Sequence, residues 1–164
     1  MDAAFVSKLP AHEIGDCAVR ELRRNGVDTS LLLRGGPRLG VYFIEKGASQ
    51  RASKVIYDRA GSSVALAKAG EYDWDKIFSN ANWFHWTGIT PALSDDCAEA
   101  CFNACKTAQQ RGITVSCDLN YRKKLWSREK AGEVMTKLMP YVDVCISNGE
   151  DAKDVFNIEA ANNN

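Results

Sequence analysis

Residues 116–126, SCDLNYRKKLW, place an acid, an amide and several cations directly after a short apolar run. Arg122 could clamp a carboxylate or a phosphate through two parallel hydrogen bonds, and Asn120 and Tyr121 could supply orienting hydrogen bonds. A solvated surface turn with exposed cations explains the same residues. The spacing alone leaves both interpretations open.

A second polar pair lies in YDRAGSS, residues 57–63. Tyr57 and Arg59 stand two residues apart at a predicted strand end, so their side chains point to the same side. A phenol and a guanidinium in this arrangement could hold a hydroxyl and the carboxylate of one polyol acid. A pair that only stabilises two neighbouring strands is an equally good interpretation.

The segment SNGED, residues 147–151, also has two interpretations. Its S-x-x-E spacing predicts a capping box, in which Glu150 reaches back to the backbone amide of Ser147. Asn148 and Asp151 could instead help to hold a hydrated Mg²⁺ ion or a phosphate, because Mg²⁺ takes few carboxylates and keeps several waters.

The polar segments of the second half follow predicted strands. The three strands are Trp83–Thr87, Ile113–Cys117 and Val142–Ile146. Helices that begin after Ser94 and Ser127 separate them, and a further helix starts near Gly149. This alternation predicts right-handed crossovers and a parallel sheet. Because ligands bind beyond the carboxyl ends of such strands, we expect TGITPALS, DLNYRKKLW and SNGEDA to converge at one edge.

The first half of the chain has a different pattern. Residues 11–26 predict a helix with Ile14, Cys17, Ala18 and Leu22 on its apolar face. Two β-rich segments follow, Leu39–Glu45 and Lys54–Asp58, and the polar link between them predicts a hairpin with a longer loop. A short helix is predicted over Tyr72–Ser79.

Composition narrows the function classes. The 164 residues carry 21 basic and 21 acidic side chains, so the formal net charge of +0 gives no reason to expect nucleic acid or an anionic membrane as partner. No apolar run approaches a membrane span and the N-terminus does not resemble a signal peptide, so we expect a cytoplasmic protein. Neither G-x-G-x-x-G nor G-x-x-x-x-G-K-[ST] occurs, so the sequence shows no glycine-rich loop of the kind that binds phosphate.

The cysteines Cys97, Cys101 and Cys105 recur every four residues and so lie on one face of a predicted helix. This spacing favours packed, reduced thiols over a metal site.

Several segments together carry a family resemblance: FVSKLPAHEIGDCAVRELRRNGVDTS, YDRAGSSVAL, HWTGITPALS, DLNYRKKLW and SNGEDA. They resemble the 2-keto-3-deoxygluconate kinases of the ribokinase-like sugar kinase superfamily. The similarity runs from Phe5 to about Phe156, and the run D-x-N-Y-R-x-x-L-W is specific to this subgroup.

The resemblance implies an α/β fold, namely a three-layer α/β/α sandwich with a small β-sheet lid. It predicts one partial domain over 1–164, with lid strands in 39–58 and the parallel βαβαβα portion in 82–157. The implied reaction is phosphoryl transfer from ATP, with Mg²⁺, to the terminal hydroxyl of 2-keto-3-deoxygluconate. Homo-oligomerisation through the lid is expected by the same resemblance.

The resemblance also assigns residues. It implies that the sugar-acid pocket is lined by Tyr42, Tyr57, Arg59, Ile89 and Arg122, with Asn120 as a support. The superfamily's Asn-x-x-Glu pattern here reads Asn148-Gly-Glu-Asp151, which makes Asn148 and Asp151 the candidates for organising nucleotide and Mg²⁺.

No residue of the chain is predicted to be the catalytic base. In the superfamily this base is the Asp of a Gly-Ala-Gly-Asp segment, and no such segment occurs in the 164 residues. We therefore expect a fragment that is inactive by itself. Two alternatives remain, another ribokinase-like sugar kinase such as a fructokinase, and a non-catalytic sugar-acid-binding fragment.

Overall fold

The structure is a computed structural model and describes residues 2–159 of the chain. The chain divides into two compact units, Met1–Ala67 and Lys68–Asn164. None of the helices in the described part is long and apolar enough to cross a membrane.

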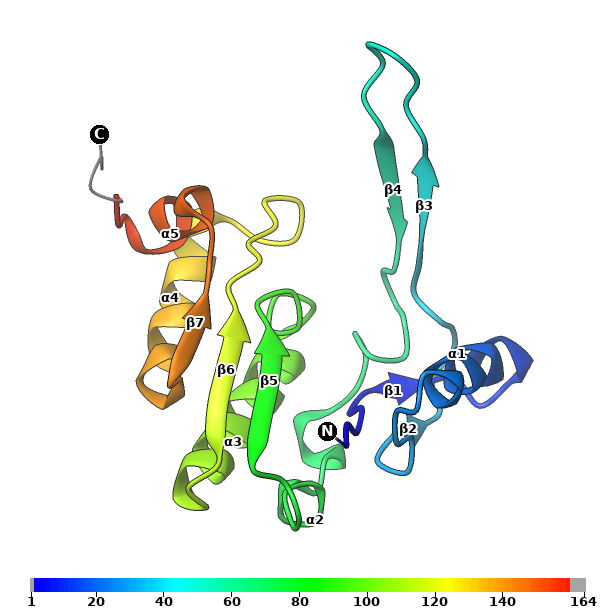
Figure 1. Cartoon of the computed structure of the whole chain (residues 1–164), viewed down its shortest axis with the longest axis vertical. Coiled ribbons are helices and arrows are strands. Elements are labelled where there is room, and N and C mark those ends of the chain that lie inside the picture. Colours follow the sequence, from blue (N-terminus) through cyan, green and yellow to red (C-terminus); the bar gives the residue numbers. More distant parts are fainter. Residues whose placement is uncertain (1, 160–164) are drawn as a thin grey trace. The chain divides into compact units, whose positions relative to one another are not determined.

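The second unit is built on a parallel sheet of three strands in the order β5-β6-β7 (Figure 1). The strands are β5 (Trp83–Thr87), β6 (Thr114–Asp118) and β7 (Val144–Ile146). The helices are α3 (Asp95–Gln110) between β5 and β6, α4 (Arg128–Leu138) between β6 and β7, and α5 (Gly149–Phe156) after β7. The predicted strand–helix alternation is confirmed, with strand boundaries that differ by no more than two residues.

The two long helices begin at the serines that the sequence indicates. Ser94 Oγ accepts a hydrogen bond from the backbone N–H of Cys97 at 3.2 Å, and Ser127 Oγ accepts one from that of Lys130 at 3.2 Å. Each contact satisfies an N–H that the first helical turn cannot pair internally. Local side-chain chemistry therefore decides where both helices start.

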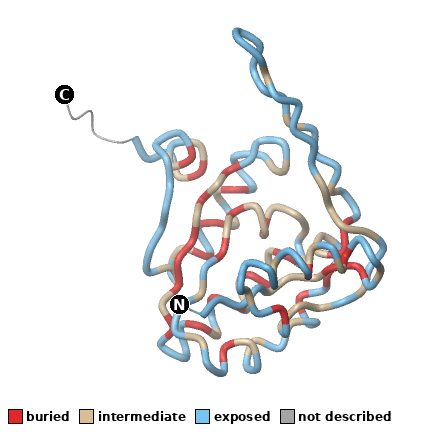
Figure 2. The backbone as a smooth tube through the Cα atoms, turned by 45° about the vertical axis from the view of Figure 1, so that its right-hand side comes forward, coloured by how far each residue is buried: buried red, intermediate tan, exposed pale blue. Residues whose placement is uncertain are grey.

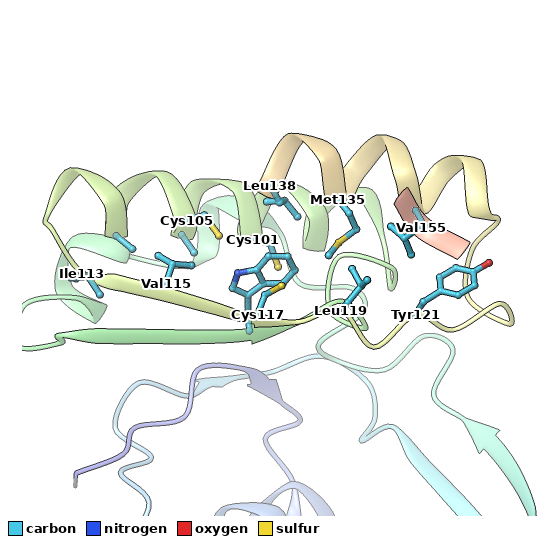
Figure 3. Close-up of a cluster of buried hydrophobic side chains, with 14 of the residues drawn as sticks. Cys101, Cys105, Ile113, Val115, Cys117, Leu119, Tyr121, Met135, Leu138 and Val155 are labelled. Atoms are coloured by element: carbon cyan, nitrogen blue, oxygen red, sulfur yellow. The ribbon is translucent and has the colours of Figure 1, made fainter. Parts of the chain in front are cut away.

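The core of this unit lies between the sheet and the helices α3 and α4 (Figure 3). Ala104, Cys105 and Ala108 on α3 are fully buried, at 0% exposure, as are Val115 and Cys117 on β6. Small side chains on this face of α3 let the helix backbone approach the sheet closely.

The cysteine pattern on α3 is a packing feature. Cys97, Cys101 and Cys105 are buried free thiols. Burial raises the pKa of Cys105 to about 12 and raises that of Cys101 well above its ordinary value. Within residues 2–159, no group of three or more His, Cys, Asp or Glu side chains could hold a metal ion. The prediction that these three thiols pack in the core is confirmed.

The second unit opens with two single-turn elements, η1 (Ala69–Glu71) and α2 (Trp74–Ile77). The helix predicted over Tyr72–Ser79 is thus shorter than expected. Asp73 begins α2, because its side chain accepts a hydrogen bond from Lys76 N at 3.0 Å.

The first unit contains α1 (Glu13–Arg24) and a short parallel pair that the sequence analysis did not predict, β1 (Lys8–Leu9) with β2 (Leu33–Arg34). The predicted apolar face of α1 is only partly confirmed. Ala18 and Leu22 are half-buried, and the buried residues of the helix are Gly15 and Val19. Ile14, at 60% exposure, and Cys17 are exposed. A Cβ atom on Gly15 would lie 2.1 Å from the carbonyl oxygen of Pro10. A close backbone approach at Gly15 therefore selects the buried face.

The predicted hairpin is confirmed as β3 (Val41–Glu45) and β4 (Lys54–Asp58), which pair antiparallel over all five residues of each strand. It is exposed along most of its length (Figure 2). Tyr42 and Phe43 point to opposite faces of the ribbon and are 61% and 60% exposed. Within the first unit, neither face of the hairpin is buried in a core.

Candidate functional site

The loops after β5 and β6 are in direct backbone contact. Gly88 N donates a hydrogen bond to the carbonyl oxygen of Asp118 at 2.8 Å. A Cβ atom on Gly88 would lie 2.1 Å from the carbonyl oxygen of Leu119, so only glycine permits this approach. The G-I-T turn that contains Ile89 therefore lies against the start of the D-L-N-Y-R loop.

Asn120 connects the same two loops through its side chain. Its Nδ2 donates a hydrogen bond to Thr87 Oγ1 at 3.0 Å. Its backbone lies in the left-handed region, with φ 40°, which Asn tolerates better than most residues. Asn120 thus links the two loops, and its role as a support of the sugar-acid pocket stays a prediction. Sequence reasoning did not identify Thr87, although it is the last residue of the predicted strand before the G-I-T turn.

The loop after β7 is tied to the D-L-N-Y-R loop as well. Leu119 N donates to the carbonyl oxygen of Ile146 at 2.9 Å, and Tyr121 N donates to Asp151 Oδ2 at 3.2 Å. Asp151 is only 9% exposed. The predicted convergence of the three strand-end segments is therefore confirmed within this unit.

The predicted capping box at Ser147 is wrong by one residue. Asn148 is the N-cap of α5, and its Oδ1 accepts a hydrogen bond from Asp151 N at 2.7 Å. Ser147 Oγ instead donates to the carbonyl oxygen of Asn148 at 2.9 Å, and Glu150 is exposed. The extended backbone of Asn148, φ −91° and ψ 166°, delays the start of the helix to Gly149.

Tyr121 does not orient a ligand with its hydroxyl. Its side chain is 7% exposed and belongs to the core (Figure 3), and its hydroxyl donates to the carbonyl oxygen of Trp126 at 3.3 Å. Leu119 and Tyr121, two residues apart, both point inward, and the left-handed backbone of Asn120 lies between them. Tyr121 thus anchors the loop.

Arg122 lies on the exposed side of this loop, as does its neighbour Lys123. Arg122 Nη1 donates to the carbonyl oxygen of Tyr121 at 2.9 Å, which folds the guanidinium back over its own loop. A guanidinium can donate five hydrogen bonds, so this contact leaves donors for an anion.

The three candidate residues of the first unit come together on the hairpin. Tyr42 and Tyr57 are directly opposite in the register, and their ring centroids are 6.3 Å apart at an interplanar angle of 48°. The guanidinium carbon of Arg59 lies 4.3 Å from the centroid of the Tyr57 ring, a distance typical of a cation–π contact. The predicted proximity of Tyr57 and Arg59 is confirmed, and Tyr42 extends the group across the ribbon.

Arg59 has an unmet hydrogen-bonding capacity. Its Nε is buried, and no acceptor in the described part of the chain bonds to it. A buried N–H without a partner costs about 1–3 kcal/mol. A cation held against an aromatic face with an unpaired N–H is a suitable place for an anionic ligand.

Comparison with known proteins defines the class of this fold. The family model described as pfkB family carbohydrate kinase matches residues 1–164. The chain belongs to this family, and the observed arrangement is a partial ribokinase-like α/β fold, as expected.

Named relatives narrow the comparison. The chain is 39% identical over 157 residues to a 2-dehydro-3-deoxygalactonokinase of Haloferax volcanii, covering 96% of this chain and 49% of the relative. A crystal structure of 2-dehydro-3-deoxygluconokinase from Thermotoga maritima matches with a TM-score of 0.95 and 50% identity, covering 98% of this chain and 49% of that one. A pfkB family carbohydrate kinase from Listeria grayi matches with a TM-score of 0.93 and 36% identity, covering 99% and 51%. The chain thus spans about half the length of these relatives.

Proposed function

We propose that this chain forms the sugar-acid-recognising part of a kinase that transfers a phosphoryl group from ATP to 2-keto-3-deoxygluconate, giving the 6-phosphate. The observation that carries the proposal is the group of Tyr42, Tyr57 and Arg59, in which a stacked guanidinium keeps an unpaired buried N–H. Arg122, at the strand-end loops of the second unit, is a further candidate cation. The names of the Haloferax and Thermotoga relatives support a 2-keto-3-deoxy sugar acid as the substrate class.

The cations favour an acid over a neutral sugar. A carboxylate accepts bidentate, charge-assisted hydrogen bonds from arginine, and these are roughly twice as strong as those between neutral groups. Two tyrosine hydroxyls suit the polyol part of the same molecule. A neutral ketose, as in the fructokinase alternative, would leave Arg59 and Arg122 without a counter-charge.

The residues suggested for nucleotide and Mg²⁺ have other contacts. Asn148 Oδ1 accepts the Asp151 N–H, and Asp151 Oδ2 accepts the Tyr121 N–H. Both side chains thus already hold the start of α5 and the neighbouring loop, and we derive no catalytic step through them. An influence on Mg²⁺ or phosphate through water remains a prediction.

A second copy of the chain is the proposed partner of the hairpin. Phe43 and Ile56 pair across the strands on one face and are 60% and 48% exposed, which is typical of an interaction surface. The proposal follows the family resemblance, as does a cytoplasmic location. Sedimentation as a monomer at all concentrations tested would contradict the dimer.

Binding of the sugar acid to the 164-residue chain tests the proposed function. In isothermal titration without nucleotide, Arg122→Ala should weaken the affinity for 2-keto-3-deoxygluconate about tenfold or more, because a charge-assisted hydrogen bond contributes roughly 1.5–3 kcal/mol. Lys123→Ala removes a neighbouring exposed cation and should leave the affinity unchanged.

A ligand panel separates the alternatives in the same titration. The epimer 2-keto-3-deoxygalactonate tests whether the chain binds more than one 2-keto-3-deoxy sugar acid. Fructose tests whether it binds a neutral sugar. Fructose binding as tight as that of the acids, or unchanged sugar-acid affinity in Arg122→Ala, would refute the assignment.

A further inference from the structure

Arg38 lies at the base of the hairpin and holds the segment that carries Arg59. Its Nη1 donates to the carbonyl oxygen of Ala60 at 3.0 Å, and its Nη2 donates to that of Asp58 at 3.0 Å. Nη2 also pairs with the Asp58 carboxylate, Oδ2, at 2.7 Å. The two carbonyl groups belong to the residues immediately before and after Arg59.

The backbone around Arg38 adds to this brace. Its carbonyl oxygen accepts hydrogen bonds from both Ser63 N, at 2.8 Å, and Ser63 Oγ, at 3.0 Å. Ser62 N donates to the carbonyl oxygen of Arg59 at 3.2 Å. Ser62 and Ser63 are 2% and 1% exposed, so these contacts are shielded from water.

Glycine makes the close approach of the two segments possible. A Cβ atom on Gly40 would lie 3.0 Å from Cβ of Arg59, and one on Gly36 would lie 2.7 Å from Ser63 Oγ. Residues 36–40 therefore pack directly against residues 59–63. The backbone at Arg59 is fixed from both sides.

Positioning explains these contacts better than stability does. The Arg38 and Asp58 side chains are 36% and 54% exposed, and an ion pair at that exposure adds little to stability. The planar fork of arginine bridges the two carbonyl groups and the carboxylate through two separate nitrogens. A lysine at position 38 would supply the charge without this geometry.

We propose that Arg38 is a positioning residue that presents the Arg59 guanidinium to the carboxylate of the sugar acid. The inference rests on the proposed function, in which Arg59 binds that carboxylate. Bracing residues 58 and 60 keeps Arg59 over the Tyr57 ring before the ligand arrives, which reduces the conformational entropy that binding must offset. Arg38 itself touches the backbone around Arg59 and acts through that residue.

Affinity measurements on substituted chains test this inference. Arg38→Ala and Arg38→Lys should each weaken binding of 2-keto-3-deoxygluconate about five- to tenfold, because the unbraced Arg59 must be ordered on binding. Arg51→Ala is the matched control. Arg51 also pairs with a carboxylate and a carbonyl group of this hairpin, those of Glu45 and Lys46, and its removal should not change the affinity.

A double-mutant cycle separates positioning from a general structural effect. In the background of Arg59→Ala, adding Arg38→Ala should cost less than about twofold in affinity. An analogue whose carboxylate is reduced to an alcohol should bind both the unsubstituted chain and Arg38→Ala with the same affinity. Asp58→Asn, which keeps the carbonyl acceptor, should have a smaller effect than Arg38→Ala.

The outcomes distinguish this inference from the proposed function. If Arg59→Ala weakens binding but Arg38→Ala does not, or if the two losses simply add, the positioning role is refuted and the proposed function stands. If Arg59→Ala leaves the affinity unchanged, both are refuted. Circular dichroism and melting temperatures of each variant show whether a loss of affinity reflects a loss of fold.

Discussion

Cys105 shows how burial changes the chemistry of a single residue. It lies on α3 against the sheet with 0% exposure, and removal from water raises its pKa to about 12, from an ordinary value of 9.0. Cys101, also buried, is shifted in the same direction. Cys17 and Cys145 are exposed. The reactive thiols of this chain should therefore be the exposed ones.

The raised pKa predicts that the chain loses stability at alkaline pH. Above about pH 9 the unfolded chain releases the Cys105 proton while the folded chain keeps it, so the free energy of unfolding falls as pH rises toward 12. Between pH 8 and 10 a single such thiol accounts for about 1 kcal/mol. Urea unfolding of Cys105→Ala should show a shallower decline, and Cys17→Ala should follow the unsubstituted chain. Equal slopes in all three would contradict this account.

At the scale of elements, the strand-end loops of the second unit behave as one connected layer. Gly88 joins the loop after β5 to that after β6, and Asp151, in the first turn of α5, joins the same loop to the segment after β7. The Asp151 carboxylate accepts the backbone N–H of Tyr121 at 3.2 Å. Tyr121 directly precedes Arg122, so Asp151 holds the backbone next to that arginine.

Asp151 is therefore predicted to support sugar-acid binding even without nucleotide. Asp151→Ala should weaken the affinity for 2-keto-3-deoxygluconate severalfold, because the loop loses its anchor at the Tyr121 amide. Asp154→Ala is the control, since this nearby carboxylate pairs with Arg128 at 2.7 Å, away from that loop. If Asp151 acts only on Mg²⁺ and nucleotide, Asp151→Ala should bind the sugar acid with unchanged affinity in the absence of nucleotide.

At the scale of the whole molecule, the chain has two units, and each contains residues that are candidates for binding a sugar acid. It covers about half of each relative, 49% of the Haloferax kinase and 49% of the Thermotoga structure. The description of 1–164 as one partial domain remains a prediction. The 164 residues also contain no Gly-Ala-Gly-Asp segment, in which the superfamily carries its catalytic base.

The chain is accordingly predicted to bind the sugar acid without phosphorylating it. Incubation of the 164 residues with ATP, Mg²⁺ and 2-keto-3-deoxygluconate should release no more ADP than ATP hydrolysis in buffer, because the 164 residues lack the Gly-Ala-Gly-Asp segment whose Asp is expected to accept the proton of the attacking hydroxyl. The Thermotoga maritima kinase in the same coupled assay is the positive control. Robust turnover would show that the chain contains a base that the sequence analysis did not identify.

The sequence alone did not predict the short strands β1 and β2, but it determined the strand–helix alternation of the second unit, the hairpin of the first unit and the family. These depend on local signals, such as the caps at Ser94 and Ser127 and the spacing of small residues on α3. The proximity of Tyr57 and Arg59 was predictable for the same reason, because two residues at a strand end share a side.

Only the tertiary structure decided which face of α1 is buried, which way Tyr121 points and what Arg38 binds. The buried face of α1 depends on Pro10, the inward position of Tyr121 depends on the core, and the brace at Arg38 depends on a carbonyl group 22 residues away. Each depends on groups that are separated along the chain and that the fold brings close together. Contacts of this kind produce no periodic pattern in the sequence, so they could not be predicted from it.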